Sequence, residues 1–340
     1  MENMETRNVE GEYFKTSRKM ITVKNLSKNY GDFGAVKGIS FSIGRGEIFG
    51  FLGPNGAGKT TTINMMIGLA RPSGGSVTIA GIDAVADVKR AQAIMGIVPD
   101  ENNLYNEMDG FDNLCFCGAL YGMHKKARCE RAGELLKMFG LEEAGNRPFG
   151  AYSKGMRRKL TIAAGIIHEP DTLFLDEPTT GIDVESARQI RSLLLKLKES
   201  GTTIFLTTHY IEEAERICDR IAFIVSGRIV AQGSPRQLMA GYSDEHIIRL
   251  AVDGDFSDLE NLSAAPLDGF TIIGKSDRTL TLSSTERTPL SPVIAYLNEK
   301  GISVYEAREL RPSLEDVFVK VTGIEAERLK KEKDKGGKAR

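Results

Sequence analysis

A glycine-rich run followed by lysine and threonine is the part of the sequence best suited to chemistry. Gly53, Gly58, Lys59 and Thr60 match the pattern G-x-x-x-x-G-K-[ST], directly after an apolar run at 47–52. Glycines at these positions let backbone N–H groups close around a phosphate, and a helix N-terminus adds partial positive charge. A glycine-rich turn without a ligand is the alternative, but the strand-to-helix context favours a phosphate-binding loop.

The predicted ligands of this loop are ATP and Mg²⁺. Lys59 is expected to supply positive charge to the β- and γ-phosphates and to act in catalysis, and the Thr60 hydroxyl is expected to ligate Mg²⁺. The nucleotide contacts expected from the loop are Gly53, Pro54, Asn55, Gly56, Ala57, Gly58, Lys59, Thr60 and Thr61.

Two consecutive carboxylates end a second apolar run, at 173–177. Such a pair is costly at the end of a buried strand unless a cation or a reaction uses it. We predict that Asp176 belongs to the Mg²⁺ shell, through water, and that Glu177 orients and deprotonates the attacking water. An ordinary helix N-terminus is the alternative, which the phosphate loop makes less favourable.

A histidine follows a third apolar run, at 203–208. A lone histidine is usually structural or exposed. His209, however, lies at the carboxyl end of a strand, where parallel sheets hold their ligands. We therefore predict a catalytic role for His209, as a sensor of the γ-phosphate.

With these motifs in order, residues 20–240 resemble the ATP-binding subunit of ABC (ATP-binding cassette) transporters. Tyr30 corresponds to the aromatic residue that stacks on adenine. The run Tyr152-Ser153-Lys154-Gly155-Met156 resembles the family signature, usually Leu-Ser-Gly-Gly-Gln, and 180–183 resembles the D-loop. The resemblance implies that the following residues bind nucleotide: Tyr30, Asp100, Ser153, Gly155, Met156 and Asp183.

Two residues depart from the family pattern. Asp100 stands where the family usually has glutamine; both offer an oxygen to Mg²⁺ or water, but aspartate adds a charge. Lys154 replaces the first glycine of the signature, which is tolerable if its side chain points outward. Both are interpreted as variants typical of one exporter branch.

The resemblance also implies a dimer. Ser153 would cap the helix that runs from Met156 to Ile167 and direct its N-terminus at a phosphate of a second subunit. Two ATP molecules would then be sandwiched between two copies, or between this chain and a paralogue. An ordinary N-cap is the alternative.

The family resemblance implies a separate membrane partner. No uncharged apolar run reaches the roughly 20 residues that span a bilayer, and the stretch 102–141 corresponds to the family's partner contact. We expect an integral membrane permease that exports a drug, lipid or ion. The alternatives are a cassette ATPase acting on ribosomes or DNA, and a regulator that binds ATP without turnover.

The predicted fold class is α/β: a P-loop NTPase cassette with a central mixed sheet and a helical subdomain. A small C-terminal α+β domain of ferredoxin-like order, β-α-β-β-α-β, follows. The predicted ranges are 1–19 for a polar extension, 20–240 for the cassette with its helical subdomain at about 100–165, 241–323 for the α+β domain, and 324–340 for a charged tail. The α+β domain is a dimer brace, a regulatory sensor or a support for the partner.

Composition fits a packed protein that does not bind nucleic acid. The chain of 340 residues is 41% hydrophobic and has a net charge of −1, so no basic field attracts nucleic acid. The N-terminus lacks the apolar core of a signal peptide, which predicts a cytoplasmic protein, peripheral on the inner face of the cell membrane. The four cysteines, Cys115, Cys117, Cys129 and Cys218, are predicted to be buried, reduced thiols.

Overall fold

The computed structural model describes residues 19–101, 103–240, 246–254, 269–276, 278–286, 288–310 and 313–323. The chain divides into two compact units at Ser234/Pro235, rather than at 240/241. The residues between these two points form helix α8 (Pro235–Ala240), which packs against α10 (Leu314–Thr322) of the second unit. The polar extension and the charged tail predicted at the two ends lie almost entirely outside the described residues.

A six-stranded mixed sheet is the centre of the first unit. Its order is β10-β9-β3-β8-β7-β6, and all neighbours are parallel except the hairpin of β9 and β10. The strands are β3 (Ile48–Leu52), β6 (Met95–Val98), β7 (Thr172–Asp176), β8 (Thr203–Thr208), β9 (Arg220–Val225) and β10 (Arg228–Gly233). Every residue of β3, β7 and β8 is buried, as expected for apolar runs covered on both faces. The predicted central mixed sheet is confirmed.

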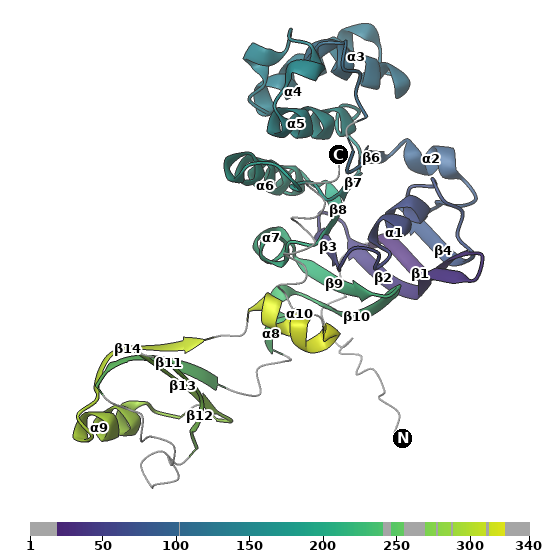
Figure 1. The fold of residues 1–340 in the computed structure, drawn as a ribbon. Coiled ribbons are helices and arrows are strands. Elements are labelled where there is room, and N and C mark those ends of the chain that lie inside the picture. Colours follow the sequence, from purple (N-terminus) through teal and green to yellow (C-terminus); the bar gives the residue numbers. More distant parts are fainter. Residues whose placement is uncertain are drawn as a thin grey trace. The chain divides into compact units, whose positions relative to one another are not determined.

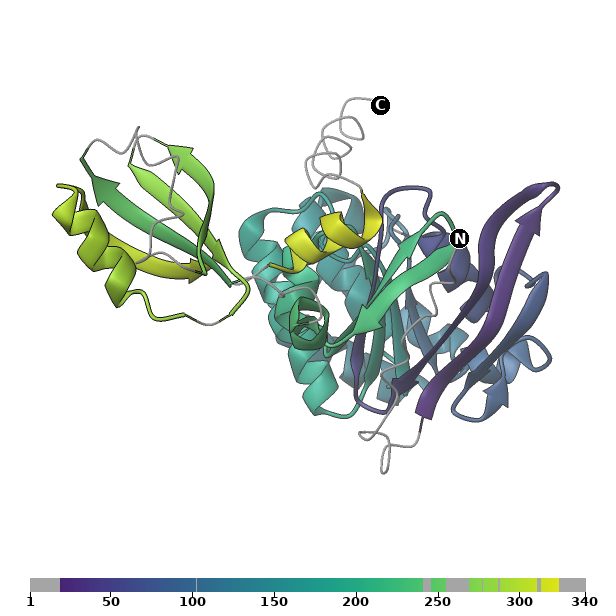
Figure 2. The same cartoon turned by 90° about the horizontal axis from the view of Figure 1, so that it is seen from below.

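A second, antiparallel sheet lies beside it and was not predicted as a separate layer. It has the order β2-β1-β4-β5, with β1 (Lys19–Tyr30), β2 (Phe33–Gly44), β4 (Gly74–Ile79) and β5 (Ile82–Asp83). Strands β1 and β2 run side by side in purple in Figure 2. Each has 12 residues, and their pairing is interrupted by register shifts.

An aromatic cluster joins the two sheets. Phe41 of β2 stacks on Phe49 of β3 at a centroid distance of 5.3 Å and on Phe205 of β8 at 5.9 Å. Helices α1 (Lys59–Met66) and α2 (Val88–Gln92) contribute buried residues to the same core. Helices α6 (Val184–Glu199) and α7 (Ile211–Ile217) pack on strands β8 and β3 of the six-stranded sheet.

Three helices form a separate group within this unit (Figure 1). They are α3 (Gly110–Leu120), α4 (Lys125–Met138) and α5 (Lys154–Gly165), with short 3₁₀ turns at Glu142–Ala144 and Phe149–Ala151. The amide of Asn113, which is fully buried, holds the entry to α3 by bonding the backbone at Tyr105, Met108 and Asp109. These helices fall in the region predicted to be helical.

The prediction of four buried thiols is wrong for three of them. Cys115, Cys117 and Cys129 are only partly buried, and Cys218 alone among the four is buried. Cys115 and Cys129 face each other between α3 and α4, with their sulfur atoms 3.5 Å apart. The three partly buried thiols lie on helices α3 and α4, which have one solvated side, whereas Cys218 lies against the six-stranded sheet at Gly50.

The second unit contains a four-stranded antiparallel sheet of order β12-β13-β11-β14. The strands are β11 (His246–Asp253), β12 (Thr271–Ser276), β13 (Thr279–Ser284) and β14 (Ser303–Leu310), and α9 (Ser291–Glu299) packs on β14. Helix α10 opens with a capping box of Ser313 and Asp316. The first helix of the predicted β-α-β-β-α-β order would fall between β11 and β12, outside the described residues, so the ferredoxin-like order stays a prediction at that element.

Candidate nucleotide site

The phosphate loop connects the buried strand β3 to helix α1. At Gly53 a side-chain carbon would lie 2.2 Å from the carbonyl oxygen of Ile224, so no larger residue fits there. Gly58 has φ +107°, in the left-handed region, where a side-chain carbon would lie 2.8 Å from the carbonyl oxygen of Ala35. Strand β9 and the start of β2 therefore fix the course of the loop. Asn55 and Gly56 at its tip are exposed, while Thr61 is half-buried.

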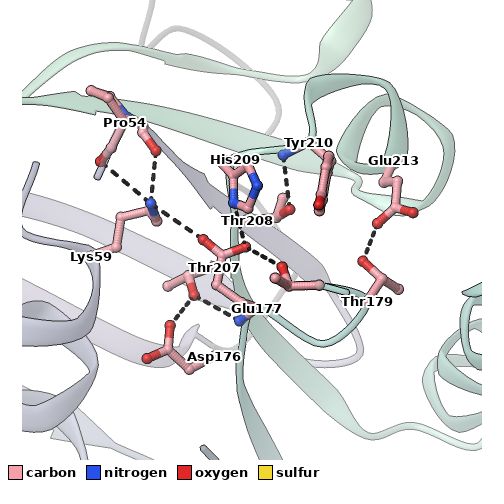
Figure 3. A network of polar contacts seen from close by, with 12 residues as sticks. Pro54, Lys59, Asp176, Glu177, Thr179, Thr207, Thr208, His209, Tyr210 and Glu213 are labelled. Carbon is pink, nitrogen blue, oxygen red and sulfur yellow. Dashed lines mark hydrogen bonds and ion pairs between the residues drawn. The ribbon is translucent and has the colours of Figure 1, made fainter. Parts of the chain in front are cut away.

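Lys59, the first residue of α1, is buried with 6% of its surface exposed. Its Nζ donates to the carbonyl oxygen of Gly53 at 2.8 Å and lies 3.3 Å from Oε1 of Glu177. The cation thus stands between the loop that would hold phosphates and the carboxylate at the end of β7. Figure 3 shows this arrangement, with Pro54 above the lysine.

Donors from three different segments surround Glu177. His209 Nδ1 lies 2.9 Å from Oε2, and Thr180 Oγ1 donates to the same oxygen at 3.1 Å. An ionised carboxylate only accepts, so Nδ1 must carry the imidazole proton in this contact. Lys59 completes the set at Oε1.

The environment of Glu177 keeps the carboxylate ionised. Burial alone would raise the pKa of Glu177, but the hydrogen bond from His209 and the charges of Lys59 and His209 lower it below the ordinary value. The backbone is also constrained, because Glu177 has φ +48° and its N–H donates to Thr207 of β8. A left-handed non-glycine residue held in this way is typical of functional sites.

Asp176 and Thr60 form an oxygen pair beside the loop. The Thr60 hydroxyl donates to Oδ2 of Asp176 at 3.0 Å, and the Thr207 hydroxyl donates to Oδ1. Asp176 is buried. A hydroxyl and a carboxylate that share a site at a helix N-terminus are the hard oxygen ligands that Mg²⁺ prefers, so the residues present fit this ion.

Asp100, at the end of β6, belongs to the same electrostatic group. Desolvation raises the pKa of Asp100, and the carboxylates of Asp176 and Glu177 raise it further, against the charges of Arg158 and Lys154. A divalent cation bound at these neighbouring strand ends would offset the repulsion among the three carboxylates.

The signature residues lie elsewhere in the unit, against helix α6. Ser153 caps α5, and its Oγ accepts from the N–H of Met156 at 3.2 Å. A side-chain carbon at Gly155 would lie 2.2 Å from Oγ of Ser186, and Asp183 caps α6 by accepting from Ser186 N at 2.8 Å. Within the described part of the chain, no hydrogen bond or ion pair joins this group to the phosphate loop.

Two other predicted residues are exposed. Tyr30 ends β1 with 53% of its surface exposed, and Lys28 Nζ lies 5.0 Å from its ring centroid. Its ring is free to receive a flat ligand on one face. Lys154 is also exposed, although its ammonium group approaches Gly181 in the D-loop region.

Arg158 is the functional candidate that sequence reasoning missed. Its guanidinium, buried on α5, donates to the backbone carbonyls of Asp176, Pro178, Pro99 and Asp100. One signal could have identified it. Arg158 falls at helical spacing from Thr161, Ile162 and Gly165, so it places a charge on the buried face of α5.

A second missed group ties the D-loop to α7. The Thr179 hydroxyl donates to Oε2 of Glu213, and Arg191 Nη1 lies 2.8 Å from the other oxygen, Oε1. Since α7 follows His209 directly, this group fixes the histidine's helix against the strand end that carries Glu177 (Figure 3).

Among the helices that the structure describes, none is both long enough and apolar enough to cross a bilayer.

Comparisons with known proteins agree on one family. A family model described as "ABC transporter" matches residues 36–180. The daunorubicin resistance ATP-binding protein DrrA3 of Streptomyces coeruleorubidus is 37% identical over 308 residues, covering 89% of this chain and 96% of the relative. The Nod factor export ATP-binding protein I of Ralstonia nicotianae is 37% identical over 318 residues, covering 91% and 95%.

One solved structure that the chain resembles is a dimer. The dimeric post-hydrolysis state of an ATP-binding cassette bound to ADP and phosphate matches with a TM-score of 0.59 at 28% identity, covering 63% of this chain and 98% of that one. The phosphate loop, the carboxylates at the strand ends and these relatives lead to one conclusion. The chain belongs to the ATP-binding subunits of the ABC transporter family.

Proposed function

We propose that this chain hydrolyses Mg·ATP as one half of a dimer and thereby drives a separate membrane permease that exports its cargo. The observation that carries the proposal is the position of Glu177, held between Lys59 and His209 at the edge of the sheet where the phosphate loop begins. A carboxylate held in this way beside a phosphate-binding loop is suited to activating water.

The loop and the start of α1 would bind the phosphates. The N–H groups from Gly56 to Thr61 lie at the N-terminus of α1, where the helix dipole favours anions. Lys59 would neutralise the β- and γ-phosphates, and Tyr30 would stack on the adenine. Thr60, Asp176 and Asp100 would hold Mg²⁺, which neutralises charge on the transferred phosphoryl group when bound.

Glu177 would act on the attacking water. A carboxylate with a lowered pKa is ionised at neutral pH, so it can accept the water's proton without first losing one of its own. The water oxygen then bonds to the γ-phosphorus while the bond to the bridging β–γ oxygen breaks, which gives ADP and phosphate. His209 keeps Glu177 oriented and presents its other ring nitrogen to the γ-phosphate side.

The signature would complete the site of a second chain. Ser153, Gly155 and Met156 lie at the start of α5, together with Asp183 at the start of α6. Their separation from this chain's own loop supports a composite site, with each ATP held by one chain's loop and the other chain's signature. The dimeric cassette among the structural relatives supports the same arrangement.

The permease and the direction of transport are inferred from the relatives. Two of them are named for daunorubicin resistance and for Nod factor export, which supports export of a cargo, such as a drug, through a separate membrane protein. The chain would then act at the cytoplasmic face of the cell membrane. The exporter relatives do not favour action on ribosomes or DNA.

The experiment is hydrolysis and binding of ATP by the purified chain and its Glu177→Gln variant. We expect the variant to bind ATP normally and to lose about 100-fold or more in kcat, the usual contribution of a general base. Glu212→Gln on the exposed side of α7 is the matched control and should retain the parent rate. Hydrolysis by Glu177→Gln at the parent rate would refute the assignment of the base.

A further inference from the structure

Arg158 is a buried cation in the middle of helix α5. Only 5% of its surface is exposed, and burial lowers the pKa of its guanidinium while nearby carboxylates oppose that shift. Arginine nevertheless stays protonated in proteins. The charge therefore has to be satisfied within the fold.

The partners of this guanidinium are backbone carbonyl oxygens from two strand-end segments. Nη2 donates to Asp176 at the end of β7, and Nε donates at 3.0 Å to Pro178 just beyond it. Nη1 donates to Pro99 and, at 3.3 Å, to Asp100, both just past the end of β6. One side chain thus fixes two neighbouring strand ends.

The two strand ends carry the carboxylates expected to bind Mg²⁺. Asp100 and Asp176 each accept from Arg158 through the backbone, which leaves both carboxylate groups available to other partners. A planar guanidinium can direct its donors to several fixed acceptors at once, whereas an ammonium group is a single point of charge. The contacts constrain the spacing of the two carboxylates without neutralising them directly.

The helix that carries Arg158 also carries the signature. Ser153 caps α5 five positions earlier in the sequence, and Gly155 lies against α6. A displacement of α5 would therefore be transmitted through Arg158 to the ends of β6 and β7.

We propose that Arg158 is a positioning residue that sets the separation of Asp100 and Asp176 and links the signature helix to this chain's own metal site. The link between two nucleotide sites rests on the proposed function, while the positioning of the carboxylates stands on the contacts alone. Arg158 does not touch the reacting atoms. It acts through the two strand ends.

The test compares Arg158→Met, which keeps bulk and removes every donor, with Arg158→Lys, which keeps only the charge. The readouts are Mn²⁺ affinity in the presence of ADP, measured by electron paramagnetic resonance, and kcat for ATP. We expect Arg158→Met to weaken Mn²⁺ binding and to lower kcat, each by about 10- to 100-fold, as for other residues that orient metal ligands. Arg158→Lys should fall between it and the parent.

Arg220→Met is the matched control. Arg220 is a partly buried arginine on β9 that donates to the carbonyl of Ser42, pairs with Glu47 and packs over Phe49, on a different strand from those that end at Asp100 and Asp176. It should lower the melting temperature and leave the Mn²⁺ affinity unchanged. If the role of Arg158 is purely structural, Arg158→Met and Arg220→Met should both lose stability, and neither should change the Mn²⁺ affinity.

The outcomes separate the claims. Parent-like Mn²⁺ affinity in Arg158→Met overturns the inference. If that variant does not fold, Arg158→Lys decides, since parent-like affinity and kcat in that variant overturn it as well. Failure of the parent chain to hydrolyse ATP would refute the proposed function, and the Mn²⁺ comparison would still decide on Arg158.

Discussion

At the scale of single residues, the chemistry depends on how Glu177 is held. Lys59 and His209 reach its carboxylate from segments far away in the sequence, and Thr180 reaches it from three residues along the chain. Each of these contacts favours the ionised form, and together they outweigh the effect of burial. The residue is therefore ready to accept a proton at neutral pH.

Thr180→Val tests this account of Glu177. The hydroxyl donates to the ionised carboxylate, so removing it should raise the pKa of Glu177. A base with a higher pKa becomes protonated at a higher pH. The acidic limb of the kcat–pH profile should therefore move to higher pH, while kcat on the neutral plateau changes little.

Thr78→Val on β4 is the control for this profile, because Thr78 is half-buried away from the carboxylate. If the acidic limb of the kcat–pH profile of Thr180→Val stays in place or moves to lower pH, the claim that this hydroxyl lowers the pKa of Glu177 is contradicted.

The motif residues could be predicted from the sequence, but most of their supports could not. Lys59, Asp176 and His209 stand in patterns that favour phosphate chemistry over the structural alternatives. Thr207 and Arg158 bond groups that are distant in sequence, and the partners of Arg158 are backbone carbonyls, which leave no side-chain pattern to read. Their roles depend on which strand ends become neighbours in the sheet.

At the scale of elements, the runs at 47–52, 173–176 and 203–207 are confirmed as buried strands, apart from the half-buried Glu47 before β3, because every other position in them meets a covered face. Strand β6 was not predicted. It has four residues, one of them Gly96, and so carries little strand signal. The separation of β1 and β2 into their own antiparallel sheet depends on long-range pairing with β4, which the local pattern does not specify.

Phe205→Ala tests the layer between the two sheets. The Phe205 ring lies 5.6–6.1 Å from four others, two of them on β3, one on β2 and one on β7. Truncation leaves a cavity where three strands meet the second sheet, so we expect the free energy of unfolding to fall by about 3–5 kcal/mol. Urea denaturation monitored by circular dichroism measures it.

Phe33→Ala is the control for that experiment, since Phe33 is 66% exposed. The free energy of unfolding of this variant should stay within about 0.5 kcal/mol of the parent value. Equal losses in the two variants would show that the aromatic layer does not hold the sheets together.

At the scale of the whole molecule, the described contacts account for one half of each proposed composite site. The phosphate loop lies beside Glu177 and His209 of the same chain, whereas the signature that begins at Ser153 packs against α6. The membrane partner and the role of residues 241–323 lie beyond what one chain's sequence can specify, since both depend on surfaces of other molecules. The expectation of a membrane partner came from the family resemblance.

The most direct measurement of the central claim is the mass of the Glu177→Gln variant in solution, by sedimentation equilibrium with Mg·ADP and with Mg·ATP. The account predicts a monomer of 37.2 kDa with ADP and a species of twice that mass with ATP, because ATP joins the loop of one chain to the signature of another. Adding Ser153→Arg to that variant should abolish the dimer while the loop still binds ATP. A Glu177→Gln variant that binds ATP and remains a monomer would contradict the composite site.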